Sequence, residues 1–505
     1  MKQPANSQRL SQAFLAALLL TACAGNPTPS SPAAAPDSAA VHLTILHIND
    51  VYEITPVAGG KSGGLARVAT VFQRLKAVNP NTRMLLAGDF VSPSALGTAR
   101  VNGVRLGGRQ MIAVLNAVGL DVATLGNHEF DLSESELNAR IGESRFAYLT
   151  SNVTDSLGKT PMGMPRHLVL RFTDARGRAA RLGIVAATID QVKKPNLRYL
   201  PSVDALRREI ALIKDSTDAI LALTHLRLAD DVLLADSLPE LALILGGHEH
   251  ENWMIRRGER FTPIIKADAN VRTVAIVDLS MSPGSRPAVN WRLVTITDSI
   301  PEDPAVAAEA KRWTDLAYDA FRKDGLEPGR VIATLPIPLD ARETMIRNQE
   351  NDFTRLLTQA LLAEAPDADV ALMNSGSVRL DDELPPGPVT EYDVIRLLPF
   401  GGKVVEVELT GSLLKAVLEQ GEANRGIGGF LLKANAARTP DGWRVGGNAL
   451  DTLRRYKVVA PDFLVSGGEQ NLGFLSERNP GFKLLKTLRD IRLVLIDELK
   501  RKWGR

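Results

Sequence analysis

Five short apolar runs in the first half of the chain each end at Asp, Asn or His, and this pattern restricts the fold more than any other feature. Segments with helical apolar spacing, such as residues 65–76, separate some of the runs. Short apolar strands that alternate with helices indicate an α/β sheet. Ligands bind outside the carboxyl ends of such strands, so the polar residues would converge along one edge. The five runs are residues 43–46, 84–87, 122–125, 219–223 and 241–245.

The length of 505 residues exceeds what one core ordinarily organises, so two or more domains are expected. A polar stretch at residues 304–323 is rich in Ala, Glu, Lys and Arg and is interpreted as a connecting helix. A second α/β region follows it. The predicted divisions are a signal peptide (1–22), an acylated Cys with a tether (23–40), a first domain (41–300), a linker helix (301–326) and a second domain (327–505).

Composition indicates a globular protein without a nucleic-acid partner. The hydrophobic share is 45% and the charged share is 23%, both ordinary for a folded chain. The net charge is +2, and no basic block stands out as a nucleic-acid footprint.

The N-terminal segment resembles a bacterial export signal. Lys2 and Arg9 flank the start of an apolar run at residues 13–20, which is too short to span a bilayer. Cys23, the single cysteine, lies where a bacterial lipobox carries its acylated cysteine; ordinary cleavage beside an incidental Cys is the alternative. Acylation would anchor the protein in the cell envelope, at the outer membrane facing the periplasm or the cell surface. Residues 24–40, rich in Pro, Ala and Ser, would form the tether.

The histidines are distributed unevenly, since five of the seven come just after an apolar run. Imidazole is the commonest side-chain metal ligand, and carboxylate and amide oxygens suit harder cations. A mixed nitrogen and oxygen set of this kind is what a two-metal site requires, with one carboxylate able to bridge. The candidate ligands are Asp50, Asp89, Asn127, His225, His248 and His250.

The block from Gly126 to Asp131 is the most specific of these motifs. Asn127 and His128 are adjacent, so one can bind metal while the other faces a substrate. Asp131 lies three residues after His128 and can accept a hydrogen bond that fixes the tautomer and orientation of the imidazole. His128 and Asp131 are therefore the predicted catalytic pair.

Ordered motifs in both halves carry a resemblance to a known family. The first half resembles the calcineurin-like metallophosphoesterases, and the second resembles the C-terminal domain of the 5′-nucleotidase family. The resemblance implies an α/β fold, with a four-layer α/β/β/α metallophosphoesterase domain, a connecting helix and a C-terminal α/β domain that binds the substrate. The motifs are Asn49-Asp50, Gly88-Asp89, Gly126-Asn127-His128-Glu129, Thr224-His225, Gly247-His248-Glu249-His250, Asn374-Ser375-Gly376-Ser377-Val378-Arg379, Leu398-Pro399-Phe400, Leu409-Thr410-Gly411, Gly429-Phe430-Leu431 and residues 462–468.

The resemblance also implies an activity and a role for each matching residue. The protein would hydrolyse phosphomonoesters, most naturally nucleotides, by attack of a metal-bound hydroxide, while His128 stabilises charge on the phosphate. Two divalent ions such as Mn, Zn, Mg or Co would be bridged by Asp89. Asp50 and His250 would complete the first metal site; Asn127, His225 and His248 would complete the second; Asn374, Arg379 and Phe430 would bind the nucleoside part.

Two positions depart from the family pattern. The first motif is usually Asp-x-His, but here Tyr52 follows Asp50 at that spacing. Three interpretations of Tyr52 are open. It would bind metal as a phenolate, which favours Fe(III), or it would donate a hydrogen bond to a metal ligand and leave the first metal more weakly held. The third interpretation is that the site is inactive. The aromatic that normally follows the second Gly-Gly motif is absent from residues 467–471, and Phe474, three residues later, is the remaining aromatic candidate for binding the substrate there. Loss of a stacking ring, worth ~1–3 kcal/mol per base, would weaken nucleotide binding.

Two alternatives to a nucleotidase remain open from the sequence. One is a sulfur-ester hydrolase like the SoxB proteins, which share this architecture. The other is a non-catalytic lipoprotein that binds ligands at the cell surface, although it would be expected to have lost several metal ligands, and only one position is altered.

Overall fold

The computed structural model describes residues 40–282 and 284–504. The predicted signal peptide, Cys23 and all but the last residue of the predicted tether lie outside these ranges. Residues 41–505 form one compact unit. Among the described helices, none combines the length and the apolar character needed to cross a membrane.

The first six-stranded sheet contains the first three apolar runs. Its strand order is β16-β15-β1-β2-β5-β6, with β1 parallel to β2 and antiparallel to β15. The carboxyl ends of β1, β2 and β5 therefore share one edge. The strands are β1 (Val41–Ile48), β2 (Thr82–Ala87), β5 (Val122–Thr124), β6 (Ala147–Leu149), β15 (Thr273–Met281) and β16 (Ala288–Thr295).

The second six-stranded sheet contains the other two runs. Its strand order is β13-β14-β12-β11-β9-β8, and β9, β11, β12 and β14 are mutually parallel. The strands are β8 (His167–Thr173), β9 (Ala179–Thr188), β11 (Ala219–His225), β12 (Leu241–Gly246), β13 (Trp253–Arg257) and β14 (Thr262–Lys266).

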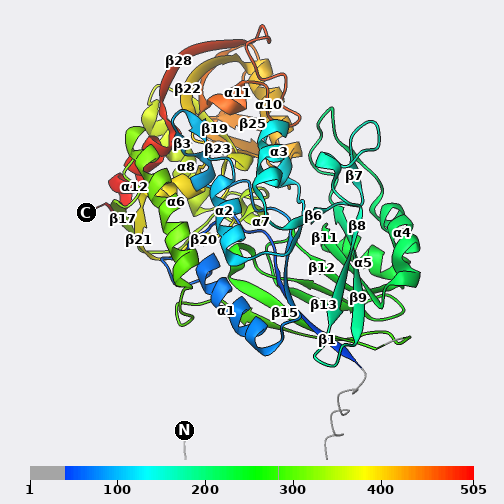
Figure 1. The fold of residues 1–505 in the computed structure, drawn as a ribbon. Coiled ribbons are helices and arrows are strands. Elements are labelled where there is room, and N and C mark those ends of the chain that lie inside the picture. Colours follow the sequence, from blue (N-terminus) through cyan, green and yellow to red (C-terminus); the bar gives the residue numbers. More distant parts are fainter. Residues whose placement is uncertain (1–39, 283, 505) are drawn as a thin grey trace, which may run out of the picture. The chain divides into compact units, whose positions relative to one another are not determined.

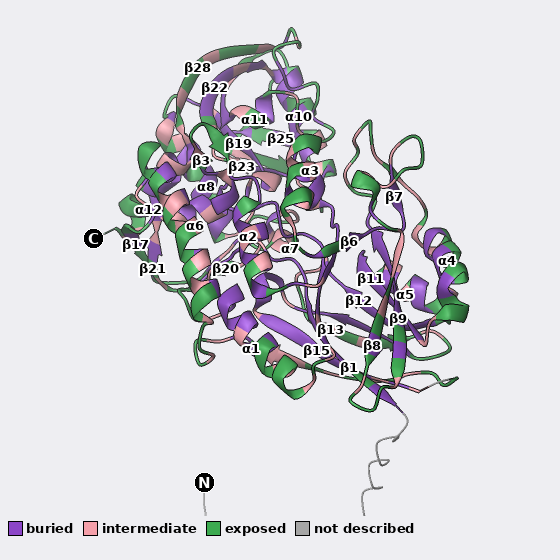
Figure 2. Cartoon of the chain, viewed as in Figure 1, coloured by how far each residue is buried: buried purple, intermediate pink, exposed green. Residues whose placement is uncertain are grey.

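The two sheets pack face to face, and helices cover their outer faces (Figure 1). Ile45 of β1 faces the second sheet, whereas Leu46 packs against the helices of the first. Burial on both faces explains why the runs are continuously apolar instead of alternating. Figure 2 shows the buried strands and the exposed outer surface of α4. The four-layer prediction is confirmed; α1 (Leu65–Val78) and α2 (Arg109–Val118) cover the first sheet, and α4 (Ser202–Ile213) and α5 (Leu228–Ser237) cover the second.

The connecting helix predicted at residues 304–323 is α6 (Pro304–Lys323). Asp303 caps its N-terminus by accepting hydrogen bonds from two backbone N–H groups, and Pro304 occupies the first helical position. The helix packs against α1 and α2. Phe321 is buried near its end and belongs to a core that continues into the second half of the chain.

The second half is built on a five-stranded sheet of order β23-β19-β27-β22-β28. Helices α8, α9 and α12 cover one face, and α10 and α11 cover the other. The predicted landmarks 370–374 and 411–419 lie in β19 and α10. The elements are β19 (Val370–Asn374), β22 (Lys403–Thr410), β23 (Leu431–Ala434), β27 (Arg455–Pro461), β28 (Phe482–Asp490), α8 (Asp352–Glu364), α9 (Glu391–Leu397), α10 (Gly411–Ala423), α11 (Asp462–Val465) and α12 (Ile491–Trp503).

Both halves also contain shorter elements. They include the 3₁₀ turn η2 (His128–Asp131), α3 (Glu134–Glu143), α7 (Glu343–Ile346), β3 (Arg100–Val101), β4 (Val104–Arg105), β7 (Val153–Thr154), β10 (Arg198–Tyr199), β17 (Val331–Leu335), β18 (Leu339–Asp340), β20 (Glu383–Leu384), β21 (Gly387–Thr390), β24 (Ala436–Thr439), β25 (Gly442–Val445) and β26 (Asn448–Ala449).

Candidate metal centre

The strand-end residues converge where the two sheets meet. Asp50 follows β1, Asp89 follows β2, and His250 lies in the loop after β12. Ligand atoms of these three side chains lie within 4.8 Å of one another, which is close enough to hold one cation. His225, the last residue of β11, places its Nε2 3.1 Å from Asp89 Oδ2 and 4.0 Å from Asp50 Oδ1. Side chains from both sheets therefore share one site.

The backbone is strained at these positions. Asp50, Asp89, His248 and His250 have φ values of 52°, 55°, 90° and 57°, a region that non-glycine residues rarely adopt. Each such residue costs ~1–3 kcal/mol and persists only where its surroundings over-determine it, as they do at functional sites. Gly126 shows how tightly the loops pack, because a Cβ there would lie 2.1 Å from Asp89 Oδ1.

Tyr52 places its hydroxyl inside this cluster. Its oxygen lies 2.9 Å from His250 Nε2, 3.3 Å from Asp89 Oδ2 and 3.4 Å from Asp50 Oδ1. Burial, together with the charges of Asp89 and Asp50, raises the pKa of Tyr52 well above its usual value. Without a cation the phenol is therefore neutral and donates a hydrogen bond.

The cluster is electronegative and attracts positive charge. Asp50 and Asp89 are fully buried, and the neighbouring histidines outweigh the effect of burial, so the pKa of both carboxyls lies below its usual range. Burial lowers the pKa of His225, but the two carboxylates outweigh it and raise this pKa to about 9. A proton on His225 partly neutralises the site, and a metal ion would do so more completely.

Two buried atoms of the centre have no hydrogen-bond partner within residues 40–282 and 284–504 and are suited to bind a metal ion. Asn127 Oδ1 and His225 Nε2 are buried without a hydrogen-bond partner in the described part of the chain. The 3.1 Å approach of His225 Nε2 to Asp89 lacks hydrogen-bond geometry. Buried polar atoms are nearly always paired, so such atoms call for a ligand. Burial, with His225 nearby, lowers the pKa of His248 to about 3, which keeps that imidazole neutral and able to coordinate.

The predicted catalytic pair is present at the rim of the site. His128 Nδ1 lies 2.7 Å from Asp131 Oδ2, and Ser92 donates a hydrogen bond of 3.3 Å to the same oxygen. The backbone N–H of His128 donates to Asp89 Oδ1 at 2.8 Å. Burial lowers the pKa of His128, but Asp89 and Asp131 outweigh it, so the net pKa lies above its usual value.

Sequence reasoning assigned no role to two residues that support the centre. Asn49 donates from Nδ2 to Asp50 Oδ2 at 2.7 Å and fixes that carboxylate. Glu129 accepts backbone N–H bonds from residues 89, 90, 91 and 126, which ties the loops after β2 and β5 together. Both residues belong to motifs that carry the family resemblance, so the sequence marked their positions. A motif does not reveal which neighbours a side chain contacts, and their supporting roles could not be read from it.

The second half of the chain also reaches the centre, which the sequence did not predict. Asp381 contacts His250 Nδ1 and accepts a hydrogen bond from the backbone N–H of Glu343 at 2.7 Å. Arg379 lies close enough to lower the pKa of both His128 and Asp131 through its charge, and its Nη1 is 3.6 Å from Glu343 Oε1. The predicted substrate-binding Arg379 therefore lies near the catalytic pair.

The other predicted substrate residues are placed differently. Asn374 donates a hydrogen bond of 2.6 Å to Glu469, within the atypical loop. Phe430 is 2% exposed, and Arg425 and Lys433 lie over its ring, so no face is open to a base in this arrangement. Phe474 is 37% exposed. Sequence alone gave no sign of the burial of Phe430, which arises from packing in the core of the second half.

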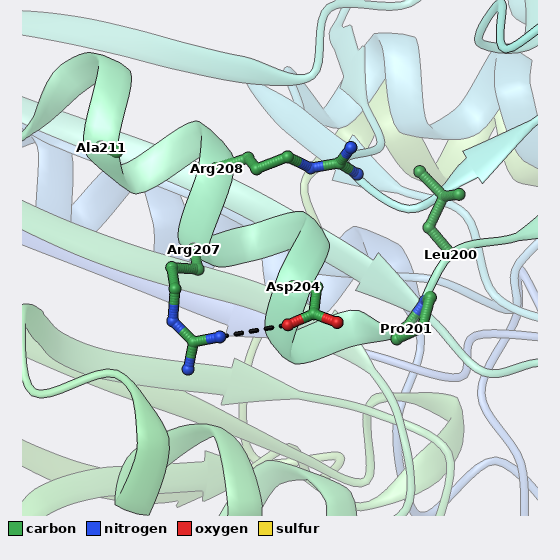
Figure 3. Close-up of a pocket in the computed structure, with 6 residues that line it drawn as sticks. All are labelled: Leu200, Pro201, Asp204, Arg207, Arg208 and Ala211. Carbon is green, nitrogen blue, oxygen red and sulfur yellow. Dashed lines mark hydrogen bonds and ion pairs between the residues drawn. The ribbon is translucent and has the colours of Figure 1, made fainter.

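A separate hollow of about 490 Å³ lies at the start of α4 (Figure 3). Asp204 and Arg207, both on α4 and largely exposed, form an ion pair of 3.1 Å beside it. None of its lining residues is a predicted site residue, and it offers no cluster of metal ligands, so the strand-end cluster remains the candidate site; the lining is Leu200, Pro201, Asp204, Arg207, Arg208 and Ala211.

Comparison with known proteins gives the same two-part description. The family described as calcineurin-like phosphoesterase matches residues 43–252, and the 5′-nucleotidase C-terminal domain matches residues 331–476. The human 5′-nucleotidase is 25% identical over 503 residues, covering 86% of this chain and 84% of its own length.

Two solved structures share the fold. The 5′-nucleotidase precursor of Thermus thermophilus has a TM-score of 0.72 at 22% identity, covering 92% of this chain and 97% of its own. The sulfate thiohydrolase SoxB of the same organism has a TM-score of 0.67 at 20% identity, with coverages of 91% and 94%. A calcineurin-like phosphoesterase implies a divalent metal cofactor, which the cluster of Asp50, Asp89 and His250 fits. The chain therefore belongs to the 5′-nucleotidase family of calcineurin-like phosphoesterases, and it is a hydrolase that acts on phosphoester bonds.

Proposed function

We propose that this chain hydrolyses phosphomonoesters of nucleotides, as a 5′-nucleotidase. The observation that carries the proposal is the convergence of two buried carboxylates, Asp50 and Asp89, with His225 and His250 beside the His128–Asp131 pair. The nucleotide as substrate class is supported by relatives that carry the name 5′-nucleotidase.

Two metal ions would be held by the strand-end residues, with Asp89 common to both. Such ions supply Lewis acidity, which activates water and neutralises phosphoryl oxygens. Asp50 and His250 would hold one ion, with Tyr52 beside them; Asn127, His225 and His248 would hold the other.

The protein's own groups would orient the phosphate and stabilise its charge. Asp89 and Asp131 outweigh burial and raise the pKa of His128, which favours the protonated form that can donate a charged hydrogen bond to a phosphoryl oxygen. Asp131 keeps the proton at Nδ1 and thereby aims Nε2 outward. Arg379 brings a second positive charge to the same region.

Tyr52 would make the two metal positions unequal. Its hydroxyl already lies among the ligand atoms of the first position, at 2.9 Å from His250 Nε2. Because burial and two carboxylates raise its pKa, only a strongly Lewis-acidic ion such as Fe(III) would ionise it near neutrality. With a divalent ion, Tyr52 would remain a hydrogen-bond donor beside the metal.

Phosphate release from AMP and a generic aryl phosphate, and from the UMP and glucose 1-phosphate that cleavage of UDP-glucose would form, each with Mn²⁺ or iron, tests the proposal. We expect metal-dependent release, fastest from AMP. The His128→Ala protein, purified in the same way, controls for contaminating phosphatases. Hydrolysis of a sulfur ester in place of phosphate esters would support the SoxB-like alternative. Release from no substrate with any metal would support a non-catalytic binding protein.

We also propose that the protein is exported and held at the outer membrane by acylation of Cys23. The proposal is supported by the apolar run at residues 13–20 and by the single cysteine that follows it. Labelled palmitate should be incorporated into the natural protein and not into Cys23→Ser. Equal labelling of the two would contradict the anchor.

A further inference from the structure

Lys266, the last residue of β14, is an unusual component of the protein interior. Its side chain is 1% exposed, although lysine is almost never fully buried unless its charge is paired. Removing an ammonium group from water costs several kcal/mol before its partners compensate. The partners of this ammonium therefore indicate what the residue is for.

All three N–H donors of Lys266 are used next to predicted metal ligands. Nζ donates to the carbonyl oxygen of Leu226 at 2.7 Å and to that of Gly247 at 2.8 Å. It also contacts the carboxylate of Glu249. Leu226 directly follows His225, Gly247 directly precedes His248, and Glu249 lies between His248 and His250. The Lys266 ammonium thus joins the segment around His225, at the end of β11, to the loop after β12 that carries His248 and His250.

Two carboxylates extend this bridge between the loops. Glu249 also accepts the backbone N–H of Leu228 at 2.5 Å. Asp231 lies 2.8 Å from Lys266 Nζ and accepts a hydrogen bond from Thr224, the residue before His225. The packing around Lys266 is close, because a Cβ at Gly246 would lie 2.8 Å from the Lys266 side chain. This network therefore links the segment after β11 to the loop after β12.

We propose that Lys266 is a positioning residue that sets the placement of His225, His248 and His250, acting with Glu249 and Asp231. The proposal rests on the proposed function, in which these histidines bind metal. Removing such supporting contacts typically lowers metal affinity by ~10–100-fold. The groups proposed for catalysis, His128 and Asp131, lie on other loops and stay in place.

Three variants of the full chain test this proposal: Lys266→Met, Glu249→Gln and the double variant. Lys266→Met keeps most of the apolar stem but leaves the buried Asp231 and the partly exposed Glu249 without their cation, so it should lose both stability and metal affinity. The double variant also removes the charge of Glu249 and should recover part of the lost stability, while Asp231 remains unpaired. A positioning role predicts that its Mn²⁺ affinity stays at least ~10-fold below the natural protein.

Mn²⁺ dissociation constants of metal-stripped protein, unfolding temperatures and the kcat at saturating Mn²⁺ are the measurements. We expect weakened Mn²⁺ binding in all three variants, with kcat at saturating metal near the natural value. Lys311→Met, an exposed lysine on α6, is the matched control and should change nothing. If Lys266→Met does not fold, Glu249→Gln alone still reports on the bridge.

Each adverse outcome has a separate meaning. Mn²⁺ affinity within about twofold of the natural protein in the folded variants, or affinity that recovers in step with stability in the double variant, would overturn the positioning role. Failure of the natural protein itself to bind Mn²⁺ would instead overturn the proposed function on which the role rests.

Discussion

Asn49→Ala should destabilise the protein even though Asn49 contacts no substrate. Its side chain is 1% exposed and makes three hydrogen bonds. Nδ2 donates to Asp50 Oδ2 at 2.7 Å and to the carbonyl oxygen of Ala267 at 2.9 Å, and Oδ1 accepts the N–H of Ala267 at 2.9 Å. These bonds join the end of β1 to the loop after β14.

The magnitude follows from which groups lose their partners. Ala267 is fully buried, so truncation leaves its N–H and C=O without their side-chain partner and away from water. Each unsatisfied buried group costs ~1–3 kcal/mol, which places the total at ~2–6 kcal/mol. Asp50 retains one hydrogen bond at Oδ2, the oxygen that Asn49 contacts, because the N–H of His248 donates to it at 2.9 Å. The carboxylate should therefore become less well oriented without being released.

Urea unfolding of metal-stripped protein, followed by tryptophan fluorescence, measures this loss. Asn290→Ala is the matched control, because Asn290 is exposed on β16 and its side chain has no hydrogen-bond partner in the described ranges. An unchanged m-value with a lower midpoint would attribute the effect to stability. A loss below ~0.5 kcal/mol, the size of an ordinary surface substitution, would refute the claim that these bonds hold the edge together.

Further predictions concern the centre itself. Metal titration of stripped protein should show two unequal steps, and Tyr52→His should bring them closer together; equal tight binding in the natural protein would contradict the role given to Tyr52. His128→Ala should lower turnover by orders of magnitude with metal content unchanged, and near-normal turnover would remove the residue from the mechanism. Because Asp131 raises the pKa of His128, Asp131→Asn should shift the alkaline loss of activity to lower pH, and an unshifted pH profile would argue against the pair. Asp381→Ala should weaken metal binding ~10-fold by removing the acceptor at His250, whereas Asp382→Ala, which loses an ion pair with Arg272 and a hydrogen bond from the N–H of Glu383 but no contact with His250, should not.

The sequence was sufficient to predict the edge where the candidate site forms, for a geometric reason. Parallel strands present their carboxyl ends on the same side, so Asp50 after β1 and Asp89 after β2 become neighbours once the first sheet forms, whereas His225 of β11 joins them only because the second sheet packs against the first. The block around Asn127 and His128 added the catalytic pair, whose contact depends only on local spacing. The neighbours within one sheet and the contact within this block needed no knowledge of packing between distant segments.

Other contacts could not be predicted because they depend on that packing. Asp381 lies 131 residues from His250, and nothing local to either residue marks the contact. Lys266 is charged and would be expected at the surface, yet it is buried beneath the histidine loops. Phe430 lies in a motif associated with base stacking, but the core of the second half encloses its ring. Each case depends on burial, which a local pattern does not encode.

The unpaired atoms of the centre lie on one side, and this asymmetry bears on how metal would load. Asn127 and His225 each have a buried atom with no hydrogen-bond partner among the described residues, so a cation on their side would break no contact within the protein and would displace only the proton of His225. On the other side His250 is occupied at both nitrogens, by Tyr52 at Nε2 and Asp381 at Nδ1. A cation there must break the contact with Tyr52 before it can bind. Tyr52, which stands where the family motif has His, is therefore also the residue whose hydrogen bond a cation must displace. The Tyr at this position thus explains both the departure from the motif and the less accessible metal position.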